Sequence, residues 1–301
     1  MTLPSGTCFG FAITSARQIP FLRGGGGDPL LIETTAGPAP DLGPIITRWT
    51  PNDRNPIAAV LHSGPDGGYR LRVEEDGWYS IDPEEGRISC PPGYHSIAGA
   101  IRLLGLPLLL LCLSRGDSTL HAATVEVNGR AIVLAAPGRH GKTSLAATFV
   151  NHGHRLLTED LTCLRLGDSM AVVPGPTGLR VRQDMTDVLP VSGYRQIGTY
   201  QDRLVLAPVS DAGDCSPVPL AGVVMVADFE DRTSLMELDP AQAVPNLWYL
   251  SFHLPSDDER ARKFQALVDL VASVPVWELR RPPGPALLDA TVETIIEAVS
   301  P

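Results

Sequence analysis

The feature that most constrains this chain is a phosphate-binding loop pattern at residues 136–143. These eight residues, Ala-Pro-Gly-Arg-His-Gly-Lys-Thr, fit the pattern G-x-x-x-x-G-K-[ST] except that Ala136 replaces the first glycine. An apolar stretch at 130–136 predicts a strand before the loop, and a helix is expected from Lys142 to about residue 152, ended by Gly153. A strand, a glycine loop and a helix in this order are typical of α/β proteins that bind phosphate.

Each part of the loop pattern has a chemical role. Backbone N–H groups at the start of the helix attract a phosphate, the lysine reaches the β- and γ-phosphates, and the threonine hydroxyl can ligate Mg²⁺. Among 24 basic residues only Lys142 and Lys263 are lysines, which favours a specific role for Lys142. We predict a site for ATP or GTP with Mg²⁺, with a structural turn as the alternative. The expected nucleotide-binding residues are Gly138, Arg139, His140, Gly141, Lys142, Thr143 and Ser144.

Two adjacent acids, Glu159 and Asp160, follow the strand expected around residues 154–157. In an α/β sheet the end of this strand and the phosphate loop should emerge at the same edge. Beside a magnesium nucleotide, such a pair can hold the metal and accept the proton of an attacking hydroxyl. We predict Thr143, Glu159 and Asp160 as metal ligands and Asp160 as the general base, with a solvated turn as the alternative reading of the acids.

His121 opens the apolar run expected as a strand at residues 120–127, just before Asn128-Gly129. Asn-Gly between two apolar runs predicts a tight antiparallel hairpin. Such a hairpin would bring His121 beside the loop and Asp160, so we include it with Glu159 and Asp160 among the candidate catalytic residues. A structural histidine with satisfied hydrogen bonds is the alternative.

Taken together, residues 120–164 resemble the C-terminal domain of HPr kinase/phosphorylase and its kinase-like relatives. The family has a histidine, a hairpin, a phosphate loop, a Gly-His-Arg-Leu stretch and two acids in the order found here, with the stretch at residues 153–156. The resemblance implies an α/β fold, with a phosphoenolpyruvate-carboxykinase-like P-loop kinase core preceded by a small β-rich N-terminal domain. It covers about one sixth of the chain, with fainter echoes at 174–184, 219–226 and 275–279.

The chain also departs from that family. Ala136 replaces a glycine, Arg139 occupies a position that is usually small, and Glu159 stands where the bifunctional enzymes have an aspartate. We do not find the glycine- and arginine-rich C-terminal segment that those enzymes use to dephosphorylate phosphoserine on HPr. The resemblance therefore implies a kinase without phosphorylase activity. Its overall plan is similar to kinases encoded with ribosomal-peptide gene clusters, including those that phosphorylate lasso-peptide precursors on a C-terminal serine.

Composition and patterning set the remaining expectations. The net charge of -10, without a basic run, argues against nucleic-acid binding, and five scattered cysteines without a C-x-x-C pair fit a reducing cytoplasm. The apolar run at 103–113 contains Pro107 and falls short of the ~20 residues that span a membrane. We expect a cytoplasmic protein with a β-rich domain at 1–95 and the P-loop domain at 96–301. Residues 96–114 should form a helix between them.

Two further patterns are predicted to be structural. Arg180 and Arg182 should project from one face of a strand, and we predict that this face is solvated. The alternative is that they pair with phosphate or with a peptide carboxylate. Ser256 and Glu259 predict a capping box for a helix to residue 273. The apolar face of that helix is expected to hold Ala261, Phe264, Leu267, Val268 and Val271.

The sequence thus predicts an ATP- and Mg²⁺-dependent kinase that phosphorylates a serine-type hydroxyl, most readily on a ribosomal, lasso-type precursor peptide. One alternative is a nucleotide-binding regulatory module without phosphoryl transfer, favoured by the loss of glycine at Ala136. Another is a kinase of free serine or a similar small metabolite, which shares every residue of the site. The partner is then a peptide or small hydroxyl-bearing substrate, and the resemblance leaves a homo-oligomer open.

Overall fold

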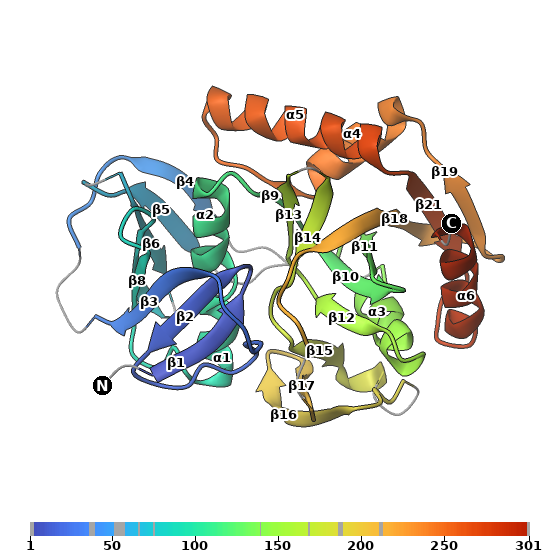
Figure 1. Cartoon of the computed structure of the whole chain (residues 1–301), viewed down its shortest axis with the longest axis horizontal. Helices are drawn as coiled ribbons and strands as arrows, with labels where there is room; N and C mark the ends of the chain where they lie inside the picture. The colour runs from blue at the N-terminus through green and yellow to red at the C-terminus, as the bar shows by residue number, and fades with distance from the viewer. Residues whose placement is uncertain are drawn as a thin grey trace.

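The computed structural model describes residues 3–35, 40–50, 58–65, 67–74, 76–138, 140–167, 169–185, 189–210 and 213–299, with side chains from residue 6 onward. These residues form a mixed α/β structure with an eight-stranded, a ten-stranded and a three-stranded sheet (Figure 1).

The N-terminal part of the chain forms the eight-stranded sheet, in the order β1-β2-β3-β8-β7-β6-β5-β4. Its inward-facing side chains alternate with partly exposed ones, as in β2, so one face builds a core. The β-rich character expected for this region is confirmed. The strands are β1 (Leu3–Cys8), β2 (Phe11–Ser15), β3 (Asp28–Thr34), β4 (Ile45–Trp49), β5 (Ala59–Ser63), β6 (Tyr69–Val73), β7 (Gly77–Asp82) and β8 (Arg87–Cys90).

The prediction of a single helix at residues 96–114 is wrong, because two helices occupy this segment. α1 (Ile97–Leu103) ends before Gly105, whose backbone is not helical, and α2 (Leu106–Ser114) begins there with Pro107 in its first turn. By length and composition, 97–114 qualifies as a membrane span, yet 56% of it is buried in the protein. Both helices share a core with the N-terminal sheet, and α2 also contacts β9 (Ser118–Leu120). The domain boundary at residue 95 stays a prediction, and this packing favours a boundary further along the chain.

The ten-stranded sheet carries the loop pattern. Its main path is β12-β10-β11-β18-β14-β13-β9-β20, and β21 pairs with β18 and β19 beside that path. Asn128 and Gly129 both have positive φ, as the predicted tight hairpin requires. The strands besides β9 are β10 (Ala122–Val127), β11 (Arg130–Ala135), β12 (Arg155–Thr158), β13 (Thr162–Leu166), β14 (Met170–Val173), β18 (Val218–Phe229), β19 (Ser234–Glu237), β20 (Ser251–Phe252) and β21 (Val276–Arg281).

Helices cover both faces of this sheet (Figure 1). α3 (Lys142–Asn151) and α6 (Leu288–Val299) share one core with it, and α4 (Pro240–Tyr249) and α5 (Asp257–Ser273) share another. The small sheet, β15 (Leu179–Arg182), β17 (Arg203–Pro208) and β16 (Tyr194–Tyr200), is followed along the chain by the long central strand β18.

The face predicted for α5 is partly wrong. Its buried residues are Lys263, Leu267 and Leu270, whereas Phe264 is 53% exposed. Lys263 is turned inward because its ammonium donates to Ser118 Oγ and to the Thr119 carbonyl, both at 2.7 Å. The capping box is only half formed. Ser256 Oγ accepts from the Glu259 N–H at 3.3 Å, but the Glu259 carboxylate pairs with Arg262.

Candidate active site

Strand register brings His121 to the phosphate loop. β10 and β11 are antiparallel with Ala122 opposite Ala135, so the residue before β10 lies beside Ala136 at the start of the loop. The expected continuous strand at 120–127 is interrupted at His121, because β9 and β10 pair with different strands. The His121 N–H donates to the Leu250 carbonyl at 2.7 Å, which fixes the backbone at this junction.

The acid pair reaches the same edge by way of β12. This strand is antiparallel to β10 and therefore runs in the direction of β11, so both strands end at one edge. Thr143 Oγ1 donates to Glu159 Oε1 at 2.8 Å, which joins the loop helix to the acids. The predicted proximity of loop and acids is confirmed.

The start of α3 is free of side-chain caps. Ser96, Asp239 and Ser256 cap α1, α4 and α5, whereas the residue before α3 is Gly141, with φ of +88° and no side chain to accept a hydrogen bond. The first N–H groups of a helix have no partner within the helix, so this end presents donors and positive potential to an anion.

Lys142 is buried beneath the loop and has two partners. Its Nζ donates to the Ala136 carbonyl at 2.7 Å and to His121 Nε2 at 3.0 Å. Burial lowers the pKa of His121, with Asp160 opposing and Lys142 adding to this effect. Because Lys142 donates to Nε2, we assign the proton of the neutral ring to Nδ1, which lies 3.5 Å from Asp160 Oδ1.

Arg180 binds both acids. Its Nε donates to Glu159 Oε2 at 2.9 Å, and its Nη2 lies 2.8 Å from Asp160 Oδ2. Although burial favours the neutral acid, Arg180 and then His121 hold the pKa of Asp160 well below its usual range. The prediction that Arg180 belongs to a solvated strand face is therefore wrong. Arg180 is part of the site. Arg182 does fit that expectation, since it is exposed and pairs with Asp184.

The other predicted loop residues have less specific surroundings. His140 lies 3.2 Å from Asp228 Oδ1 and 3.1 Å from the Gly138 carbonyl, so it braces the loop. Ser144 lies in the first turn of α3, where its carbonyl accepts from Thr148 Oγ1. Arg139 lies outside the described residues.

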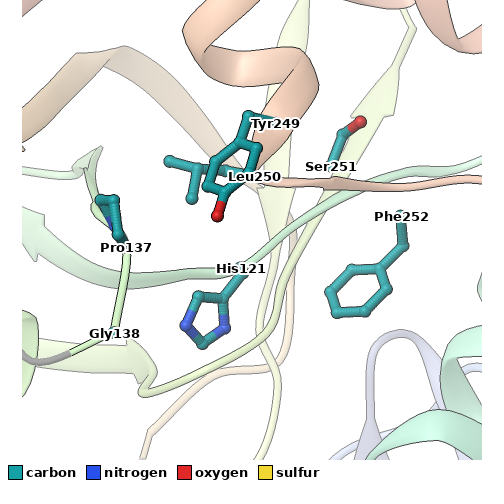
Figure 2. A pocket seen from close by; sticks show the side chains of 7 residues that line it. All are labelled: His121, Pro137, Gly138, Tyr249, Leu250, Ser251 and Phe252. Atoms are coloured by element: carbon teal, nitrogen blue, oxygen red, sulfur yellow. The ribbon is translucent and has the colours of Figure 1, made fainter. Parts of the chain in front are cut away.

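A cavity of about 240 Å³ opens beside the loop (Figure 2). In Figure 2 the hydroxyl of Tyr249 is turned toward the His121 ring. The cavity adjoins one face of the catalytic histidine candidate and has room for a small group such as a serine side chain. It is lined by His121, Pro137, Gly138, Tyr249, Leu250, Ser251 and Phe252.

Arg281 is a residue of this edge that the sequence analysis missed. It is the last residue of β21. This strand is parallel to β18, and β18 is parallel to β11, so all three strands end on the side of the loop. A Cβ placed on Gly141 would overlap Nη2 of Arg281. The available signal was the strand expected at 276–279, whose end should lie at the edge where ligands bind.

Comparisons with known proteins add little. No family model matches the chain, and no curated protein matches it. Among solved structures, the Hpr(Ser) kinase/phosphatase from Coxiella burnetii is similar at 14% identity, over 61% of this chain and 99% of that chain, with a TM-score of 0.32. Similarity at this level carries no argument, so the geometry of the site has to support the function by itself.

Proposed function

We propose that this protein is an ATP- and Mg²⁺-dependent kinase that transfers the γ-phosphoryl group to a serine-type hydroxyl. The observation that supports it best is the meeting of Lys142, an uncapped helix start, the Thr143–Glu159 contact and Asp160 at one sheet edge. We also propose that the core belongs to the phosphoenolpyruvate-carboxykinase-like P-loop class.

The residues fit a magnesium nucleotide. A threonine hydroxyl and two carboxylates are the oxygen donors that Mg²⁺ prefers, and the α3 N–H groups with Lys142 suit the phosphates. When bound, Mg²⁺ would neutralise charge on the β- and γ-phosphates. Thr143, Glu159 and Asp160 would hold it.

In the proposed reaction, Asp160 accepts the proton of the acceptor hydroxyl. The hydroxyl oxygen forms a bond to the γ-phosphorus as the bond from that phosphorus to the β–γ bridging oxygen breaks, and ADP leaves. A low pKa makes Asp160 a weak base, which suits a loose transition state that depends mainly on positioning and charge stabilisation. His121 and Arg180 orient the carboxylate from two sides.

We propose a flexible peptide with an accessible serine, of the lasso-precursor type, as the acceptor, with free serine as the competing substrate. The cavity beside His121 is a candidate place for the acceptor hydroxyl. A regulatory nucleotide-binding module is the second candidate function. The observation that favours it is that Arg180 already pairs with both acids.

The test begins with nucleotide binding. We expect Mg²⁺ and ATP to raise the melting temperature of the wild type, because a ligand of the native state stabilises it by mass action, and Lys142→Ala to lose most of this shift. Arg182→Ala, in an exposed ion pair, serves as the control. A peptide ending in serine and free serine are then incubated with ATP and followed by mass. Binding without any phosphoryl transfer would favour the regulatory module, and no thermal shift would contradict both candidates.

A further inference from the structure

Arg281 is a buried cation without an acidic partner. Its residue is 4% exposed, and no carboxylate among the described residues lies within ion-pair distance of its guanidinium. Nη1 donates to the Pro282 carbonyl at 3.0 Å and to the Gly284 carbonyl at 3.4 Å, whereas the buried Nε has no hydrogen-bond partner. Burial lowers the pKa of this guanidinium, and no neighbouring acid raises it. A buried charge left in this state is costly unless a ligand supplies the counter-charge.

The direction of the side chain indicates where that counter-charge would lie. Trp277 and Leu279 share the face of β21 with Arg281 and belong to the core beneath α3 and α6. Nη2 approaches Gly141, the residue before α3, so closely that a Cβ there would overlap it unless the arginine shifted. The guanidinium is therefore aimed at the uncapped start of the loop helix. The Nη2 end of a nearly fully buried side chain and a helix start without a side-chain cap meet at this point.

The neighbouring cations already have partners. Lys142 donates to Ala136 and His121, and Arg180 is held by Glu159 and Asp160. Arg280, on the opposite face of the same strand, pairs with Glu230 and Glu278. Among the described residues, Arg281 contacts the Pro282 and Gly284 carbonyls and the Phe229 ring, whose centroid lies 5.3 Å from its Cζ, but no acid. An anion on the α3 start would balance its charge.

We propose that Arg281 binds the terminal phosphate of a nucleoside triphosphate seated on the loop. The inference rests on the proposed nucleotide binding and adds a phosphate ligand from the last strand of the sheet, far from the loop in sequence. A guanidinium offers several donors in a fixed fork, which suits phosphate oxygens. Because its charge would face the terminal phosphate, Arg281 should contribute more to ATP affinity than to ADP affinity.

The test compares Arg281→Met with Arg280→Met in the full chain, with ATP and ADP affinities measured by calorimetry in the presence of Mg²⁺. Loss of a charge-assisted contact should weaken ATP binding by about 10- to 100-fold in Arg281→Met. The loss for ADP should be smaller, and Arg280→Met should bind both like the wild type. Arg281→Lys should recover part of the ATP affinity, because it restores the charge but not the fork.

The outcomes separate the two proposals. Wild-type binding of ATP with unchanged affinity in Arg281→Met would overturn the role of Arg281 and leave the kinase proposal standing. An equal loss for ATP and ADP would also overturn the terminal-phosphate assignment. A wild type that binds neither nucleotide would contradict nucleotide binding itself. If Arg281→Met does not fold, judged by circular dichroism, Arg281→Lys decides: affinities equal to those of the wild type would overturn the inference.

Discussion

Two nearly fully buried arginines show how differently two regions of this protein are built. Arg23, 2% exposed, lies where the N-terminal sheet meets β12, and donates to the carbonyls of Leu156, Leu157 and Gly175 at 2.7 to 3.0 Å. Arg281, 4% exposed, lies at the loop edge with an unpartnered Nε and without an acid beside it in the part of the chain that the structure describes. In the first region the buried arginine donates to carbonyls of the protein itself. In the second region the buried arginine is proposed to bind the phosphate of a ligand.

The contrast has a structural basis. β12 is an edge strand of the ten-stranded sheet, so carbonyls on its outer side need donors from elsewhere. Arg23 supplies them and thereby supports the strand that leads to Glu159 and Asp160. The loop edge instead presents donors, namely the first N–H groups of α3 and nearby cations. These groups need an acceptor, which the proposed nucleotide phosphate would supply.

The largest effect is expected at the junction with the N-terminal sheet. Arg23→Met removes a buried donor from three carbonyls, of which Leu157 keeps the Gly175 N–H, and should lower the free energy of unfolding by about 3–5 kcal/mol. Urea denaturation measures this loss, with the exposed Arg17→Met as a control expected within about 0.5 kcal/mol of the wild type. A loss below about 1 kcal/mol in Arg23→Met would remove the distinction drawn between the two regions.

The next effect concerns the loop edge, where function and not stability should suffer. Asp160→Asn, which keeps an oxygen that can ligate Mg²⁺, should still fold and bind nucleotide but lower phosphoryl transfer by about 100-fold or more, because a positioned base is lost. The measurement is the rate of phosphopeptide formation, with Asp184→Asn, in an exposed ion pair, as control. Near-normal turnover would mean that Glu159, His121 or a water takes the proton.

The smallest effect concerns Lys263, the buried lysine outside the proposed site. Lys263 lies near Cys163 and His253, and burial lowers its pKa to about 7 from an ordinary 10.5. Between these values the unfolded chain holds a proton that the folded protein lacks, so stability should rise with pH, and below about 7 both states carry it. Against Lys263→Met, the wild type should gain about 1 kcal/mol per pH unit between pH 7 and 9.

Denaturation at several pH values measures this slope. The control is Arg260→Met, on an exposed position of the same helix, which should keep the slope of the wild type. If Lys263→Met also keeps that slope, the buried ammonium of Lys263 is not its source.

Local patterns were enough to predict much of the site. The hairpin followed from Asn128-Gly129 because few residues adopt positive φ at two successive positions, and the loop helix followed from the Gly-Lys-Thr pattern. The hairpin and the direction of β12 then placed His121 and Asp160 near Lys142. The split at residues 104–105 was missed because the helical spacing of apolar residues continues through it, although Gly105 and Pro107 are local signals of a break.

By itself, the sequence determined the features that depend on neighbouring residues: the loop, its helix, the hairpin and the acid pair. The tertiary structure decided which distant side chains complete the site. Arg180 and Arg281 come from strands far from the loop in sequence, and alternation says only that such a residue faces one side of its strand. Whether that side meets solvent, an acid or a helix start depends on sheet order, which is fixed by long-range packing and has no local signal.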